Sequence, residues 1–267
     1  EDAISCCKKA IELNPNDYHF YVLAVNLFKK KRMYNEAVEF YKKAIVMNPG
    51  DSESHEFLIE ASLNLAITYI NQNQFDKAIK FCHECVSKEP ENPGFLSLLA
   101  KAYEFSGAIY KALELYEKII AAVAPDKIKV ETQFGAARCY KAKGDVDKAI
   151  EYSEKALELN HRYPELYGYL SELYFSKERF NDAISNAKKA IELNPELSQP
   201  FSILAVCYAA VSDYESAEKN AKKAIELNPD LSRPFAVLAD CYCAVSDYEN
   251  AEKNAKKALV LNPADIH

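Results

Sequence analysis

The chain has 267 residues, a formal net charge of -7, and 49% hydrophobic residues. That apolar share is large enough for a continuous core, yet no run approaches the ~18 apolar residues that a membrane-spanning helix needs. The negative balance offers no basic field to attract phosphate backbones. We therefore expect no nucleic-acid partner and no membrane insertion.

Composition favours helices. There are only 6 Gly and no Trp, with many Ala, Leu, Lys and Glu, which are good helix formers. The 8 cysteines predict free thiols in a reducing compartment, since disulfide frameworks belong to small secreted domains without a core. No secretory signal is visible, so we expect a cytoplasmic protein. Glu1 is not an initiator Met, which indicates a fragment of a longer chain.

From its first residues the chain repeats itself. Residues 1–17 match the second helix of a helix pair whose first helix is missing. The segment Ala-Ile-Glu-Leu-Asn-Pro ends at Pro15, Pro195 and Pro229, and related segments end at Pro49 and Pro263, with Pro15 and Pro49 34 residues apart. A period of this length predicts stacked helical repeats. The predicted full repeats span 18–51, 59–92, 93–126, 130–163, 164–197, 198–231 and 232–265.

Each repeat carries the same apolar frame. Its first half has a large residue, then a Leu or Ala and a small residue, then an aromatic; its second half has small residues before a proline. This spacing places one apolar stripe on each of two helices, and the proline stops the second helix. In residues 18–51 the frame is Tyr21, Ala24, Val25, Phe28, Ala37, Tyr41, Ala44 and Pro49.

Two insertions break the period. Seven extra residues follow Pro49, and three more fall near 124–129. Asp51 and Ser52 are good helix caps. We therefore interpret the first insertion as a longer first helix and not as a domain boundary.

This pattern resembles the tetratricopeptide-repeat (TPR) family, whose unit is a helix-turn-helix of about 34 residues. The resemblance implies an all-α fold: a right-handed superhelical solenoid of about seven repeats plus one orphan N-terminal helix, forming a single array over 1–267. It also implies a scaffold that binds a partner protein or peptide in a concave groove lined by the first helix of each pair. Mapped onto this chain, the groove residues are Val22, Leu23, Asn26, Leu63, Asn64, Ile67, Lys101, Phe105, Phe134, Arg138, Tyr169, Glu172, Phe175, Ile203, Val206, Arg233, Val237 and Asp240.

One known use of the family is excluded here. Chaperone-binding members grip a C-terminal carboxylate with two asparagines and three cations. The equivalent positions read Val22, Asn26, Asn64, Gly94 and Leu98, so the asparagines match and the cations are missing. Without them a dicarboxylate tail loses its charge-assisted hydrogen bonds.

No constellation for catalysis, cofactor binding or a metal stands out, and we expect no enzyme activity. Cys82 and Cys85 form a Cys-x-x-Cys pair, but they occupy packing positions of a second helix and lack further metal ligands. We therefore expect both thiols to be buried and reduced, as small apolar residues. Lysine pairs such as Lys222–Lys223 recur at one phase of the second helix, which favours a solvated face.

Residues 198–231 and 232–265 are identical at 24 of 34 positions, and their differences spare the apolar frame. Both chain ends look cut, so apolar stripes around Ile4, Cys7, Ala255, Ala258 and Leu259 are expected to be open for end-to-end self-association. Two alternatives to a binding scaffold stay open. The array could select substrates for a larger enzyme such as a glycosyltransferase, or it could serve oligomerisation.

Overall fold

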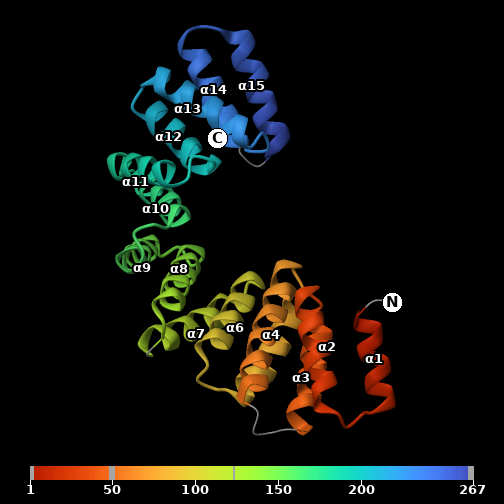
Figure 1. Cartoon of the computed structure of the whole chain (residues 1–267). Coiled ribbons are helices and arrows are strands. Elements are labelled where there is room, and N and C mark those ends of the chain that lie inside the picture. Colours follow the sequence, from red (N-terminus) through yellow and green to blue (C-terminus); the bar gives the residue numbers. More distant parts are fainter. Residues whose placement is uncertain (1–2, 48–51, 123, 264–267) are drawn as a thin grey trace. The chain divides into compact units, whose positions relative to one another are not determined.

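The computed structural model describes residues 3–47, 52–122 and 124–263, and every regular element in that part of the chain is a helix (Figure 1). The expected all-α class is thus confirmed. The expectations for Tyr41, for Pro49 and for caps at Asp51 and Ser52 lie outside the described residues and side chains. In chain order the helices are α1 (Ala3–Leu13), α2 (Tyr18–Lys30), α3 (Tyr34–Met47), α4 (Ser52–Asn71), α5 (Phe75–Lys88), α6 (Pro93–Phe105), α7 (Ile109–Ala121), α8 (Asp126–Ala142), α9 (Val146–Leu159), α10 (Pro164–Ser176), α11 (Phe180–Leu193), α12 (Ser198–Ala210), α13 (Tyr214–Leu227), α14 (Ser232–Ala244) and α15 (Tyr248–Leu261).

The helices pair as the period predicts. Each predicted full repeat contains one helix pair, from α2 and α3 to α14 and α15, while α1 is the unpaired helix that comes first. The expected longer first helix is α4, which has 20 residues and begins at Ser52. The second insertion likewise lengthens α8, which has 17 residues.

The turn inside each pair is set by one residue with left-handed backbone. Such a residue lets the following N–H donate back to the carbonyl five positions earlier, which gives a carbonyl at the end of the first helix a partner. In the pair α12–α13, Ser212 has φ 62° and the Asp213 N–H donates to the Tyr208 carbonyl at 2.9 Å. The residues in this conformation are Arg32, Asn73, Gly107, Gly144, Glu178, Ser212 and Ser246.

Side chains also define where the second helices begin and end. Asp213 caps α13 by accepting from the Ser216 N–H at 3.1 Å, which satisfies a helix N–H that has no partner within the helix. At the other end, Asn228 has extended backbone, and the next residue is Pro229. The same Asp and Asn roles recur in α15, at Asp247 and Asn262. Local chemistry thus fixes the helix lengths within each repeat.

Small residues let the paired helices approach closely. Ala217 and Ala224 of α13, like Ala205 of α12, have no exposed surface. Close contact between helix axes depends on such small side chains. Around them, larger residues such as Leu204 and Leu238 fill the space between successive pairs, at 4% and 5% exposure.

The chain folds as two compact units, Glu1–Ile128 and Lys129–His267. Their boundary falls at the second insertion. In the first unit, Ile4 and Cys7 pack with Val25 and Phe28 in one buried cluster. The prediction that Ile4 and Cys7 form an open stripe is therefore wrong, because α1 turns this stripe onto α2. At the other end of the chain Ala258 is also buried, while Leu259 is 45% exposed.

Candidate functional site

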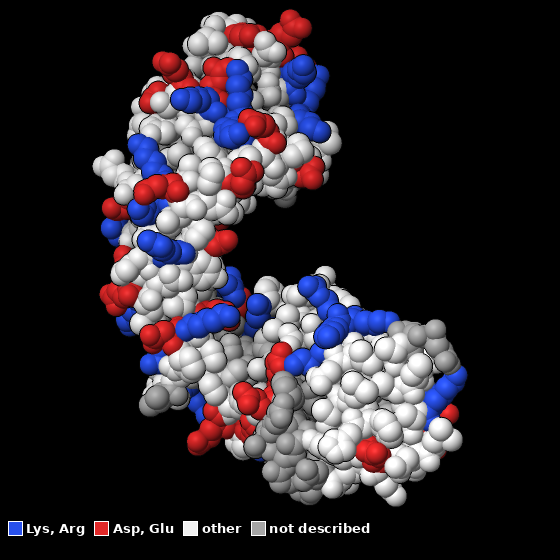
Figure 2. Space-filling model, viewed as in Figure 1, with Lys and Arg blue, Asp and Glu red and all other residues white. Residues whose placement is uncertain are grey.

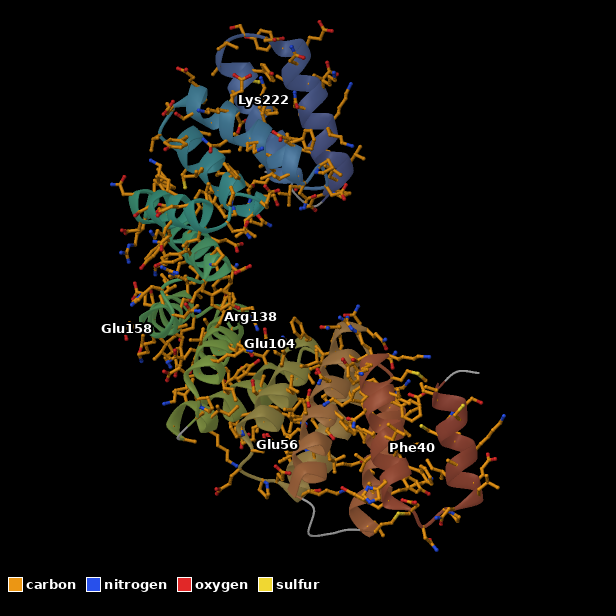
Figure 3. The ribbon with its side chains drawn as sticks, viewed as in Figure 1. Phe40, Glu56, Glu104, Arg138, Glu158 and Lys222 are labelled. Atoms are coloured by element: carbon orange, nitrogen blue, oxygen red, sulfur yellow. The ribbon has the colours of Figure 1, made fainter. Side chains whose placement is uncertain are left out.

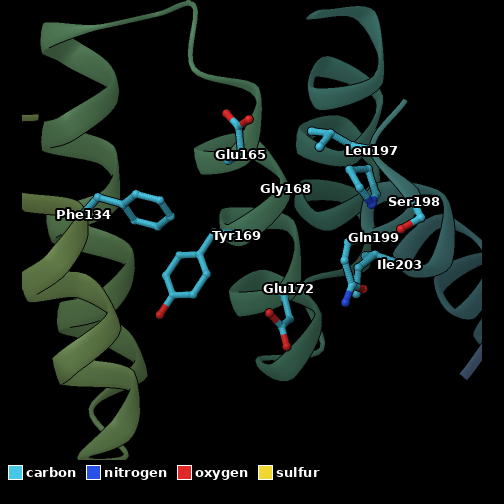
Figure 4. Close-up of a pocket in the computed structure, with 10 residues that line it drawn as sticks. Phe134, Glu165, Gly168, Tyr169, Glu172, Leu197, Ser198, Gln199 and Ile203 are labelled. Atoms are coloured by element: carbon cyan, nitrogen blue, oxygen red, sulfur yellow. The ribbon is translucent and has the colours of Figure 1, made fainter. Parts of the chain in front are cut away.

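The second unit has a cavity of about 270 Å³ where α8, α10 and α12 meet (Figure 4). All three are first helices of their pairs, and we name this feature the α8–α10–α12 cavity. Figure 3 shows Arg138 of α8 and Glu158 of α9 on opposite sides of their pair, so first and second helices present different faces. The cavity is lined by Phe134, Glu165, Gly168, Tyr169, Glu172, Leu197, Ser198, Gln199, Pro200 and Ile203.

Two aromatic rings form one wall of the cavity. Phe134 and Tyr169 meet edge to face, with their centroids 5.3 Å apart, an arrangement that aromatic pairs favour. The Tyr169 hydroxyl donates to the Ala137 carbonyl of α8 at 3.4 Å. The Arg138 guanidinium lies over the other part of this wall, 4.6 Å from the Phe134 centroid. These contacts hold the wall in place, so a ligand meets a rigid surface.

Gly168 keeps the cavity open. A Cβ at this position would lie 3.4 Å from Pro200 Cγ, so any longer side chain on Gly168 would occupy the space between α10 and α12. Pro200 is buried and its ring is rigid. Ile203 closes the floor at 1% exposure. The cavity therefore has fixed apolar walls, with its depth set by a missing side chain.

Charged groups lie at the rim. Glu172 pairs with Lys141 at 3.0 Å, and the Lys141 ammonium also lies 5.3 Å from the Tyr169 centroid. Glu165 is exposed at the same rim. Exposed pairs of this kind contribute little to stability. They leave a polar edge around an apolar interior, the usual build of a ligand pocket.

The structure gathers only part of the predicted groove. Phe134, Tyr169, Glu172 and Ile203 line the α8–α10–α12 cavity, and Arg138 flanks it. A second group from the prediction lines a hollow between α12 and α14, described below. The predicted positions of the first unit include exposed apolar side chains, at Leu23, Ile67 and Phe105. The remaining predicted residues of that unit are Val22, Asn26, Leu63, Asn64 and Lys101, and those of the second unit outside both features are Phe175 and Arg233.

Burial changes the role of two predicted residues. Ile203 and Val237 are 1% and 4% exposed, so they form floor and packing and not an open surface. Sequence reasoning also missed Gly168, Glu165 and the turn residues before α12. Glu165 and Gly168 lie on α10, the same first helix as the predicted residues Tyr169 and Glu172. Gly168 was overlooked because a residue without a side chain offers no chemistry to assign.

The Cys82–Cys85 pair is only half as predicted. Cys82 is fully buried, and burial raises the pKa of its thiol to about 12. Cys85 is half-buried, contrary to expectation, because it faces a smaller hollow beside α3 and α4. Burial raises the pKa of its thiol to about 11. Within the described part of the chain, none of the eight cysteines forms a disulfide, and no cluster of three His, Cys, Asp or Glu side chains could hold a metal.

The lysine pairs sit among acidic neighbours. Lys222 binds Glu218 at 2.6 Å and Lys223 binds Glu226 at 2.7 Å, all on α13. Figure 2 shows acidic and basic side chains interspersed over the second unit. Such intrahelical pairs use the lysine charges locally, which fits the expected solvated face.

The family is shown by sequence comparison. Patterns described as tetratricopeptide repeat match residues 30–102 and 69–130, and again residues 130–162, 164–197 and 201–231. The chain belongs to the tetratricopeptide-repeat family. Arrays of this family are protein-interaction scaffolds, and this is the class of protein that the repeats define here. None of the described helices is both long and apolar enough to cross a membrane.

Particular relatives are distant. The human protein General transcription factor 3C polypeptide 3 is 24% identical over 186 residues, which cover 68% of this chain and 20% of that protein. The chain thus spans about one fifth of this relative's length.

Solved structures share the fold at low sequence identity. Cut9, from the structure of the APC/C hetero-tetramer Cut9-Hcn1, aligns with a TM-score of 0.68 and 16% identity over 98% of this chain and 50% of that one. The C-terminal part of a TPR repeat-containing protein from Cytophaga hutchinsonii aligns with a TM-score of 0.61 and 19% identity over 94% of this chain and 97% of that one. MamA aligns with a TM-score of 0.54 and 24% identity over 62% and 95%. These likenesses establish the fold alone.

Proposed function

We propose that this protein holds an extended segment of a partner protein along its first helices, with one apolar or aromatic side chain of that segment seated in the α8–α10–α12 cavity. The observation that carries this proposal is the cavity itself. Phe134, Tyr169 and Pro200 form rigid apolar walls, and the space between them stays open because Gly168 has no side chain. A pre-formed pocket spares the partner the cost of opening it.

The energetics favour an apolar anchor. Full burial of a large apolar side chain contributes about 1.5–3 kcal/mol. The aromatic wall is already ordered by the Tyr169 hydrogen bond and by the Phe134 contact, so the protein loses little conformational freedom on binding. By contrast, Lys222 and Lys223 of α13 are already paired with glutamates, and a partner would have to replace those contacts. The first-helix face is therefore the better binding surface.

Gly168→Leu tests the proposal, because a leucine side chain at this position would occupy the cavity. The partner is first captured with the purified protein and identified by mass spectrometry. Its affinity is then measured by calorimetry against the wild type and the variant. Loss of one buried anchor predicts a fall in affinity of about tenfold or more.

Ser185→Leu supplies the matched control, since Ser185 is exposed on α11, away from the cavity lining. It adds the same side chain to the neighbouring helix and should leave the affinity unchanged. If Gly168→Leu binds the captured partner as tightly as the wild type does, while both variants remain folded, the cavity is not the anchor site.

A further inference from the structure

A second hollow, of about 600 Å³, lies between α12 and α14. We name it the α12–α14 hollow. Its lining includes both members of two pairs at which the nearly identical repeats differ, Val206 with Asp240 and Ala209 with Cys243. The hollow is lined by Val206, Ala209, Ala210, Tyr214, Val237, Asp240, Cys243 and Ala244.

Asp240 is the only charged side chain in this lining. Within the described part of the chain no Lys, Arg or His forms an ion pair with it, and no donor binds its carboxylate. Asp240 is exposed to solvent, and the partial burial of its carboxyl beside the apolar lining raises the pKa of that group above its ordinary value. The lining of the hollow thus contains one carboxyl group and no basic side chain that could neutralise it.

The backbone adds to this negative character. α12 ends at Ala210 and α14 ends at Ala244, and both residues line the hollow. The C-terminal end of a helix carries a partial negative charge because its peptide dipoles are aligned. Neither helix has a basic residue in its last turn. The two helix ends and the one carboxylate therefore all make the electrostatic potential in the hollow more negative.

The remaining lining suits a long side chain. Val206 and Ala209 offer apolar surface for an aliphatic stem, and Tyr214 contributes an aromatic ring that favours a neighbouring cation. A lysine or arginine combines such a stem with a charged end. A bare metal ion fits less well, since one carboxylate is too few ligands.

We infer that the α12–α14 hollow is a subsite for a lysine or arginine side chain of the partner segment, with the cation at Asp240 and the stem along Val206 and Ala209. The inference rests on the proposed function for the nature of the partner, and it adds a required basic residue to the bound segment. The specificity comes from Asp240, because the equivalent residue of the preceding repeat is the apolar Val206.

Cys243 allows a direct test without the partner, since its thiol is free and exposed in the lining. The protein is equilibrated with equal amounts of cystamine and bis(2-hydroxyethyl) disulfide under mildly reducing conditions at pH 7.5. Exchange forms a mixed disulfide at Cys243 and releases one small thiol in either case. The two adducts have similar length and differ by one positive charge. Their ratio at Cys243 is read by mass spectrometry of the peptide.

The ratio of cationic to neutral adduct should be about threefold higher in the wild type than in Asp240→Asn. A difference of this size is typical of one partly exposed ion pair. Asp230→Asn is the matched control, because it removes the same charge from an exposed turn and should keep the wild-type ratio. Added salt should reduce the preference.

Equal ratios in the wild type and in Asp240→Asn would overturn the inference. So would a Cys243 that takes up neither reagent while the exposed Cys6 does, since the hollow would then be closed. The Cys243 exchange test uses no partner, so its failure would not affect the Gly168→Leu result on the α8–α10–α12 cavity. Failure of the Gly168→Leu test would likewise not affect the exchange result.

Discussion

Single residues determine the shape and polarity of the proposed binding face. Gly168 makes a cavity by having no side chain, and Asp240 makes a polar point in a surface whose previous copy is apolar Val206. Neither Gly168 nor Asp240 is one of the buried alanines and leucines that hold the helix pairs together. The packing frame and the proposed binding sites thus use different positions of the same helices.

Thiol reactivity should follow burial. Cys6 and Cys243 are exposed, whereas burial raises the pKa of Cys82 to about 12 and of Cys207 to about 11. Because the thiolate is the reactive species, we expect Cys6 and Cys243 to react quickly with a disulfide reagent at pH 8. Cys82 and Cys207 should react only after unfolding. Peptide mapping after timed labelling checks this order, and a Cys82 that reacts as fast as Cys243 would contradict it.

At the scale of the helix pair, backbone conformation separates two kinds of glycine. Gly144 lies in the turn between α8 and α9 with φ 83°, a conformation that costs other residues about 1 kcal/mol or more. Gly168 lies inside α10, where glycine costs about 0.5–1 kcal/mol relative to alanine. The same substitution should therefore have opposite effects at the two sites.

We predict that Gly144→Ala lowers the free energy of unfolding by about 1 kcal/mol, although no atom lies within 4 Å of the added Cβ. Gly168→Ala should raise it by about 0.5 kcal/mol, since its Cβ would make ordinary contact with Pro200. Urea titrations followed by far-UV circular dichroism measure both values. Destabilisation by Gly168→Ala comparable to that by Gly144→Ala would show that helix context does not govern the effect.

The helices and their pairing could be predicted from the sequence because both depend on local chemistry. The proline period, the aspartate caps and the alanine frame act within one repeat, so α12 to α15 fall where the period places them. The exposure of Ile203, Val237 and Cys85 could not be predicted from position alone. Each depends on how closely neighbouring helices pack against it, and those contacts involve side chains of other helices. The cavity at Gly168 was hidden for a related reason, since its walls come from three different repeats.

For the whole molecule, charge limits the class of partner. The net charge is -7, and Lys222 and Lys223 on α13 are paired with glutamates. A nucleic-acid surface needs lysines and arginines free to replace the counterions of the phosphates. The charge pattern favours a protein partner.

We therefore predict no binding to a 25-base-pair DNA duplex at micromolar protein concentration and 150 mM salt. Fluorescence anisotropy of the labelled duplex measures this, with lysozyme, a strongly basic protein, as a positive control for nonspecific binding. Salt-dependent binding by the wild type at micromolar concentration would contradict the expected choice of partner.

The central claim is that a partner protein lies in the α8–α10–α12 cavity, and site-specific photocrosslinking tests it most directly. p-Benzoylphenylalanine is placed at Gln199, which lines the cavity, or at Lys189 on α11, which pairs with Glu192 outside it. We predict a crosslink to a second protein from position 199, its loss in a Gly168→Leu background, and none from position 189. A crosslink to that protein from position 189 alone, or one from position 199 that persists with Gly168→Leu, would contradict the claim.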